Sequence, residues 1–145
     1  MLAKALGLPS PIQRTPTMID HTGINVTDLA RSKHFYASVL ATLGYTPHLE
    51  LKDAIGFGDG DQRAGKDPGG DFWISLGDPF VPRSHIAFRA RNAAEVAAFH
   101  AAALAAGGRD NGAPGPRPHY HPGYYAAFVF DPDGYNIEAV CHSGA

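Results

Sequence analysis

Two histidines and one glutamate are the residues of this sequence whose types could hold a metal ion together. His21 and His85 each lie near the start of a segment of alternating apolar and polar residues, and Glu138 lies within the apolar stretch 137–140. Burying a carboxylate among apolar side chains is unfavourable unless a counter-charge pairs with it. Two imidazoles and a carboxylate commonly bind divalent transition metals and leave positions open for water or substrate. These three residues therefore indicate a metal site, provided that the fold brings them together.

The two histidines occupy the same place in an internal repeat. The segment that begins at Ile19 predicts a strand carrying His21 and then a helix, and the segment that begins at His85 repeats this plan. An offset of 64 residues, from 21 to 85, predicts a duplicated structural unit because three further pairs of identical residues also coincide. These pairs are Phe35 with Phe99, Leu40 with Leu104, and Gly44 with Gly108.

Each predicted helix has a start signal, and strand-like segments follow it. Thr27 or Asp28 can cap the first helix and Asn92 the second, and glycines at the ends of both helices are typical stop signals. Each half of the chain is therefore expected to contain one strand, one helix and about three further strands. The later strand-like segments are 45–51, 54–58 and 71–77 in the first half, and 123–131 and 134–140 in the second.

The repeat also predicts how many ligands the chain supplies. If two related sheets face each other across a pseudo-twofold axis, His21, His85 and Glu138 can converge on one point. At the offset of 64 the counterpart of Glu138 is Ile74, which is not a carboxylate, so three protein ligands are expected. In the alternative interpretation, each histidine is a half-buried strand residue bound by backbone groups, and Glu138 faces solvent on an edge strand.

The segment 117–128 concentrates side chains that could act on a substrate. Arg117 could bind an anionic group, and His119 or Tyr120 could transfer a proton near neutral pH. The alternative is a proline-rich surface turn whose aromatic side chains only pack. Trp73 and Phe57, on predicted strands, could line a pocket, although aromatic residues in strands are also typical of a core. The candidate substrate-binding residues are Arg117, His121, Tyr124, Trp73 and Phe57.

Length and composition bound the fold and the partners. A chain of 145 residues with 44% hydrophobic content predicts one domain, 18–145, with halves 18–80 and 81–145 after an N-terminal arm, 1–17. A formal net charge of -2 gives no reason to expect nucleic acid or an anionic membrane as a partner. No apolar run approaches the roughly 20 residues of a membrane span, and we expect a soluble protein. The single cysteine, Cys141, excludes an intrachain disulfide and is consistent with the cytoplasm.

Three motifs make the chain similar to the vicinal oxygen chelate superfamily of glyoxalases, bleomycin resistance proteins and extradiol dioxygenases. They are IDHTGINVTDLARSKHFYASVL, HIAF and FVFDPDGYNIEAV. The resemblance implies an α+β fold in which two paired βαβββ modules form a cup-shaped mixed sheet, often as a dimer. By matching position, His21, His85 and Glu138 would bind the metal inside the cup. Ile74 departs from glyoxalase I, which would supply a further carboxylate there, and the set of two histidines and one glutamate is more similar to extradiol dioxygenases or fosfomycin-resistance transferases.

The expected function is a small metalloenzyme in which a divalent ion chelates vicinal oxygens of a small-molecule substrate. Zn, Mn, Fe, Co and Ni all accept imidazole and carboxylate ligands, so the metal stays open. Lyase, isomerase, transferase and dioxygenase reactions also stay open. The alternative is a metal-independent protein that binds and sequesters a small compound in the same cup, as bleomycin resistance proteins do. A third possibility is a regulatory member without turnover.

Overall fold

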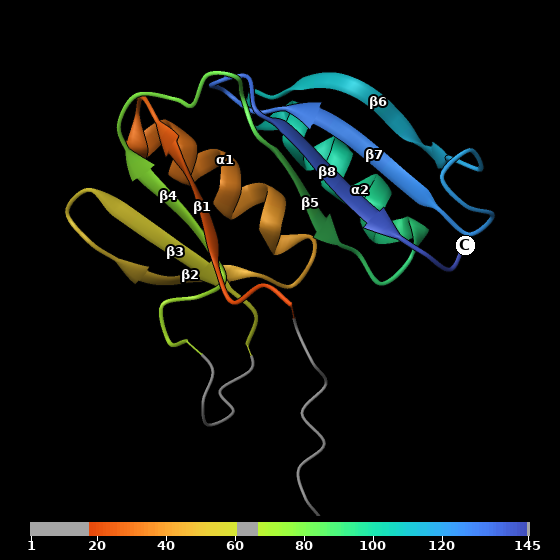
Figure 1. Ribbon diagram of the computed structural model, residues 1–145, viewed down its shortest axis with the longest axis horizontal. Coiled ribbons are helices and arrows are strands. Elements are labelled where there is room, and N and C mark those ends of the chain that lie inside the picture. The colour runs from red at the N-terminus through yellow and green to blue at the C-terminus, as the bar shows by residue number, and fades with distance from the viewer. Residues whose placement is uncertain (1–17, 61–66, 145) are drawn as a thin grey trace, which may run out of the picture.

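Each half of the chain folds into a four-stranded sheet that is covered on one face by a helix (Figure 1). The computed structural model describes residues 18–60 and 67–144, so the predicted arm at 1–17 lies outside the described residues. The predicted α+β fold of two βαβββ modules is confirmed. The elements are β1 (Thr22–Val26), α1 (Leu29–Ala41), β2 (Thr46–Glu50), β3 (Ala54–Gly58), β4 (Phe72–Leu76), β5 (His85–Arg89), α2 (Ala93–Ala105), β6 (Arg109–Pro116), β7 (Tyr125–Phe130) and β8 (Asn136–Cys141).

The two sheets repeat one topology. Sheet A has the order β1-β4-β3-β2 and sheet B the order β5-β8-β7-β6, and in both the first strand runs parallel to the last strand of its module. Figure 1 shows α1 behind sheet A and α2 behind sheet B. We call the face of each sheet that is turned away from its helix the outer face. Side chains on the inner faces and the helices form one hydrophobic core that spans both modules.

The predicted helix caps are confirmed. The Asp28 side chain accepts a hydrogen bond from the Arg31 amide at 2.9 Å, and Asn92 accepts one from the Glu95 amide at 3.0 Å. Such caps satisfy amide groups that the first helical turn leaves without partners. Of the helices in the described ranges, none is both long and apolar enough to cross a membrane.

Two sequence expectations about the elements were incomplete or wrong. Leu104, which the repeat matches with the buried Leu40, is 42% exposed, and Ala103 is buried instead. The buried residues of α2 are Val96, Phe99 and Ala103, and Leu104 lies at the edge of this stripe. No strand was predicted at β6, because its sequence RDNGAPGP is rich in glycine and proline. β6 is an edge strand with an irregular register against β7, where prolines are tolerated.

A turn between β7 and β8, which begins at the buried Asp131, locks the two modules together. In this 131–134 turn, Asp131 accepts a hydrogen bond from the Tyr36 hydroxyl of α1 at 2.6 Å. The other carboxylate oxygen of Asp131 accepts from the backbone amides of Asp133 and Tyr135. The Tyr135 hydroxyl donates to the carbonyl oxygen of Asn25 on β1 at 2.7 Å. Asp131 and Tyr135 of the second module therefore contact α1 and β1 of the first, respectively.

Candidate metal centre

A histidine and a buried carboxylate meet on the outer face of sheet B. Glu138 on β8 pairs in register with Ala87 on β5, and His85 precedes Ala87 by two residues on the same face. The Nε2 atom of His85 lies 2.9 Å from Oε2 of Glu138. The Glu138 side chain is 2% exposed, whereas that of His85 is 46% exposed. The structure therefore brings together two of the three predicted ligands and leaves one side of the pair open.

The hydrogen bonds of His85 indicate which ring nitrogen can bind an ion. Its Nδ1 atom lies 2.9 Å from the carbonyl oxygen of Asn136, which can only accept, so Nδ1 carries the proton. In the neutral ring Nε2 then presents a lone pair toward the carboxylate of Glu138. An imidazole nitrogen and a carboxylate oxygen 2.9 Å apart can share a cation, which is either a proton on Nε2 or a metal ion. Backbone carbonyls commonly orient metal-binding histidines in this way, and the separation is less than two metal–ligand bonds of about 2.1 Å each, so the donor set fits a divalent metal ion.

The second oxygen of Glu138 is bound by a tyrosine. The hydroxyl group of Tyr124 donates to Oε1 of Glu138 at 2.5 Å. Burial, and next the hydrogen bond to Glu138, raise the pKa of Tyr124 well above its usual value. The phenol therefore stays protonated and remains a donor at neutral pH.

Phe128 and Arg117 extend the centre along the outer face. Phe128 on β7 pairs in register with Glu138, and its ring stacks with that of His85 at a centroid distance of 6.2 Å. The guanidinium carbon of Arg117 lies 5.6 Å from the centroid of the same ring. Sequence reasoning included Arg117 but missed Phe128 and Asn136, which lie beside Glu138 and His85 only through strand pairing.

His21 lies apart from this pair. It directly precedes β1, its side chain is 60% exposed, and its Nδ1 atom lies 2.7 Å from the carboxylate of Asp20. That hydrogen bond is the main reason why the pKa of His21 is raised. Among the described residues, the one group of three ionisable side chains with ligand atoms within 4.8 Å of each other is Asp20, His21 and Asp67. Within one chain, His21 therefore does not complete the site of His85 and Glu138.

The expected counterpart of Glu138 in the first module was off by one residue. Gly23 on β1 is the counterpart of Ala87, and it pairs in register with Trp73, not with Ile74. Trp73 therefore occupies the position that Glu138 holds in sheet B, and Ile74 is fully buried in the core. The offset of 64 fails here because the segment before β8 is one residue longer than the segment before β4.

On the outer face of sheet A, the absence of a side chain at Gly56 leaves room for the indole of Trp73. A Cβ atom on Gly56 would lie 2.8 Å from Trp73 Cε2 and would collide with the carbonyl oxygen of Gly69. The indole nitrogen donates to the carbonyl oxygen of Gly70 at 3.2 Å, which fixes the orientation of the ring. Trp73, not the predicted Ile74, therefore takes this place in sheet A.

The loop before β7 places its aromatic side chains around Tyr124. The rings of His119 and Tyr120 lie 4.3 Å apart, and Tyr120 is 59% exposed. Nε2 of His121 lies 2.8 Å from Nδ1 of His142, a residue that the sequence gave no reason to include. The loop therefore surrounds Tyr124 with titratable rings, and only Tyr124 reaches Glu138.

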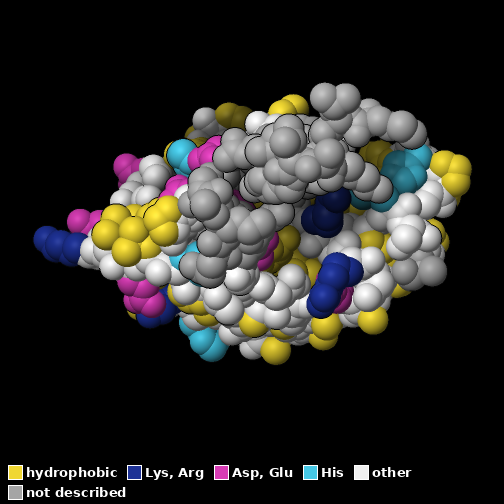
Figure 2. Space-filling view, turned by 90° about the horizontal axis from the view of Figure 1, so that it is seen from below, with side chains coloured by type: hydrophobic (Ala, Val, Ile, Leu, Met, Phe, Trp, Pro, Cys, Tyr) yellow, Lys and Arg dark blue, Asp and Glu magenta, His cyan; other side chains and the backbone are white. Residues whose placement is uncertain are grey.

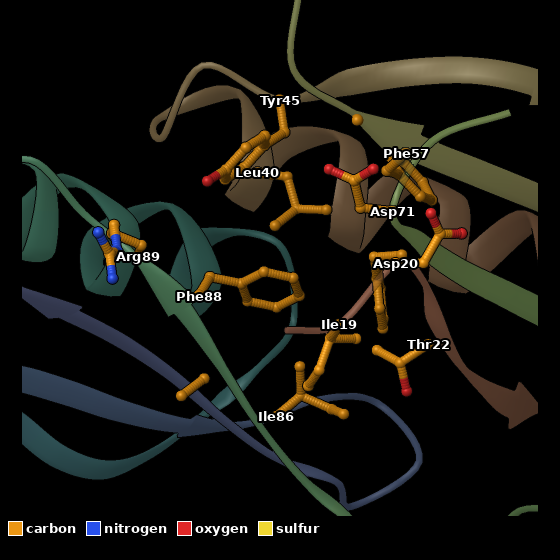
Figure 3. Close-up of a pocket in the computed structure, with 13 residues that line it drawn as sticks. Ile19, Asp20, Thr22, Leu40, Tyr45, Phe57, Asp71, Ile86, Phe88 and Arg89 are labelled. Carbon is orange, nitrogen blue, oxygen red and sulfur yellow. The ribbon is translucent and has the colours of Figure 1, made fainter. Parts of the chain in front are cut away.

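A cavity of about 250 Å³ lies at the junction of the two modules, lined by residues of β1, α1, β3, β4 and β5 (Figure 3). In Figure 3, Arg89 lies on one side of it and Asp20 and Asp71 on the other. Phe57, expected to bind substrate, is 1% exposed and lines this cavity together with Phe72 and Phe88. In the space-filling view of Figure 2, basic, acidic and hydrophobic side chains are interspersed on the visible face.

Comparisons with known proteins agree with the fold. The family model described as Glyoxalase/Bleomycin resistance protein/Dioxygenase superfamily matches residues 18–139. A search of curated proteins gives no match. A glyoxalase/bleomycin resistance protein from Albidiferax ferrireducens is 32% identical, with a TM-score of 0.71 over 86% of this chain and 98% of that one.

Two solved structures with lower identity share the fold. A lactoylglutathione lyase from Agrobacterium tumefaciens is 20% identical, with a TM-score of 0.59 over 86% of this chain and 93% of that one. A mutant of the fosfomycin resistance protein FosX from Listeria monocytogenes, complexed with Mn(II) and 1S,2S-dihydroxypropylphosphonic acid, is 20% identical. Its TM-score is 0.61 over 88% of this chain and 90% of that one.

Proposed function

Because the chain belongs to the Glyoxalase/Bleomycin resistance protein/Dioxygenase superfamily, we propose that it is a metal-dependent enzyme acting on a small molecule through two neighbouring oxygen atoms. The observation that carries this proposal is the pairing of His85 Nε2 with the buried carboxylate of Glu138 at 2.9 Å. A buried carboxylate beside an imidazole nitrogen favours a cation between them. A bound divalent ion would act there as a Lewis acid and stabilise negative charge on a substrate oxygen.

The third ligand in this proposal is His21 of a second copy of the chain. His21 and the pair of His85 and Glu138 belong to different modules, and within one chain they do not cluster. A twofold dimer that places sheet A of one copy opposite sheet B of the other would supply the missing imidazole to each site. The resulting two histidines and one glutamate leave positions open for substrate, and Zn, Mn, Fe, Co or Ni could occupy the site.

Other side chains of the chain would bind and orient the substrate. Arg117, which lies over Phe128 next to His85, would bind an anionic group. Tyr120 and His119 are exposed on the neighbouring loop and would transfer a proton between substrate and solvent. Trp73 of the second copy would form an apolar wall of the cup. Phe57 would act only through the core and the junction cavity.

The chemistry of the neighbours bears on the reaction class. One neighbour is a lactoylglutathione lyase and another is a fosfomycin resistance protein complexed with Mn(II). We favour a three-ligand transferase, lyase or dioxygenase over a four-ligand glyoxalase, because Trp73 stands where a second carboxylate would be needed.

Metal binding by purified protein tests the proposal. Protein prepared without chelator or nickel resin should contain metal, or should bind Mn(II) in calorimetric titration with one ion per chain. Glu138→Gln and His85→Ala should abolish this binding, because each removes one of two adjacent ligands. His34→Ala, in α1 of the first module, is the matched control and should bind as the wild type does. Equal binding by Glu138→Gln and the wild type would refute the proposal.

A second candidate function is metal-independent sequestration of a small compound. It is favoured by the observation that one chain by itself assembles only two ligands, while Phe128, Tyr124 and Tyr120 form an aromatic surface beside them. In this case the protein would contain no stoichiometric metal. His85→Ala would then leave the affinity for an aromatic ligand largely unchanged, whereas a metalloenzyme would lose substrate binding.

A further inference from the structure

The two oxygens of the Glu138 carboxylate have different partners. Oε1 accepts a hydrogen bond from the Tyr124 hydroxyl at 2.5 Å, and Oε2 faces Nε2 of His85 at 2.9 Å. With 2% exposure, the carboxylate has almost no contact with solvent. The phenol is therefore the group that decides which oxygen stays available on the side of His85.

We propose that Tyr124 is a positioning residue that holds Glu138 as a ligand through one oxygen. By occupying Oε1, the phenol fixes the rotation of the carboxylate and directs Oε2 toward the ion. This inference rests on the proposed function, in which His85 and Glu138 bind a divalent metal. Groups that orient a ligand in this way contribute strongly to metal affinity.

The backbone around Tyr124 is built to hold the phenol in place. The carbonyl oxygen of Tyr124 accepts from the Arg117 amide at 2.8 Å, and its amide donates to the carbonyl oxygen of His121 at 3.1 Å. Its ring packs against those of Tyr120 and His142 at centroid distances of 4.8 and 5.4 Å. These contacts fix both ends of the residue, so the hydroxyl position depends little on the hydrogen bond to Glu138.

The same contacts give the 117–124 loop a role that its exposure would not suggest. The loop is largely exposed, yet through Tyr124 it reaches a carboxylate that is buried in sheet B. Loss of the hydroxyl alone would leave Oε1 without a donor and allow the carboxylate to rotate, so that both oxygens compete for the ion or for water. The geometry therefore predicts weaker and less regular coordination in a phenylalanine variant.

The test compares Tyr124→Phe with Tyr120→Phe in the full-length protein. Tyr120 is the neighbouring tyrosine and its ring contacts Tyr124, but it makes no hydrogen bond to Glu138. Calorimetric titration with Mn(II) should show an affinity about 10- to 100-fold lower for Tyr124→Phe and unchanged for Tyr120→Phe. At saturating Co(II), the visible absorption spectrum of Tyr124→Phe should differ from that of the wild type. A purely structural role would lower the melting temperature without changing the spectrum of the loaded protein.

The outcomes distinguish a failure of the role of Tyr124 from a failure of the proposed metal site. If Glu138→Gln abolishes metal binding but Tyr124→Phe keeps the affinity and spectrum of the wild type, Tyr124 does not position the ligand and the metal site stands. If Glu138→Gln binds metal like the wild type, both the metal site and the role of Tyr124 are refuted. If Tyr124→Phe and Tyr120→Phe lower the affinity equally, the effect comes from loop packing and the inference fails.

Discussion

The hydroxyl group of Tyr36 in the first module donates a 2.6 Å hydrogen bond to the carboxylate of Asp131 in the second. Both side chains are buried, with exposures of 0% and 2%. Each is therefore unable to exchange its partner for water. The contact joins α1 to the turn between β7 and β8, so it reports directly on how firmly the two modules are held together.

Removing the Tyr36 hydroxyl should destabilise the whole chain. Tyr36→Phe leaves one oxygen of Asp131 buried without its donor, and we expect a loss of about 1–3 kcal/mol in the free energy of unfolding. Tyr45→Phe is the matched control, because no hydrogen bond of the Tyr45 hydroxyl is found in the described part of the chain. Urea unfolding monitored by circular dichroism measures the free energy of unfolding of both variants. Equal stability of the two variants would show that the contact does not lock the modules.

The same carboxylate should make stability depend on pH. Burial, the largest cause, raises the pKa of Asp131 above its ordinary value of 3.8, although hydrogen bonds from Tyr36 and two backbone amides oppose the shift. The folded protein therefore holds this proton more tightly than the unfolded chain. The stabilising contribution is complete below pH 3.8 and is lost as pH rises through the raised pKa of the folded state.

Asp131→Asn isolates this contribution. An amide in place of the carboxylate cannot ionise, so the stability of Asp131→Asn relative to the wild type should increase between pH 3.8 and neutrality. Other carboxylates titrate in both proteins and cancel in the difference. Unfolding free energies from urea titrations at a series of pH values provide the measurement. A difference that stays constant with pH would contradict the raised pKa.

A methyl group on Gly56 should disturb sheet A through Trp73. The added Cβ would lie 2.8 Å from the indole and would meet the carbonyl oxygen of Gly69. We expect Gly56→Ala to lower stability by about 1–3 kcal/mol through overpacking. Gly56→Ala should also shift the fluorescence emission of Trp73, which is the single tryptophan of the chain. At Gly60 an added Cβ would meet nothing within 4 Å, so Gly60→Ala should leave both the stability and the tryptophan fluorescence unchanged.

Subunit complementation tests whether the site is shared between two copies. His21→Ala and Glu138→Gln should each lose metal binding when purified alone. After mixing and subunit exchange, about a quarter of the wild-type binding should return, since half of the dimers are mixed and each has one site with every ligand intact. A site built within a single chain would recover nothing. Size-exclusion chromatography with light scattering establishes the dimer beforehand.

Local signals in the sequence predicted much of the fold. Asp28 and Asn92 cap their helices as expected, because capping depends on residues within one turn. β6 was missed because its residues have little preference for a strand and are held by pairing with β7. The buried stripe of α2 also differs by one residue from the stripe that the repeat suggested.

The sequence predicted the part of the candidate site that depends on strand pairing within one module. His85 and Glu138 lie on neighbouring strands of sheet B, so the family motif was sufficient to pair them. The separation of His21 depends on how the two modules pack, and no sequence period encodes that arrangement. Trp73 replaced Ile74 as the counterpart of Glu138 because register is set by hydrogen bonding between strands, not by chain length.

The two halves repeat one topology but carry different side chains on their outer faces. In the second half the outer face bears the acidic group and an imidazole, while in the first an indole lies on glycines at the matching position. A mutation near Trp73 can thus reshape the outer face of sheet A without altering the residues on β5 and β8. This division of labour would let one half of the molecule vary while the pair of His85 and Glu138 in the other half stays constant.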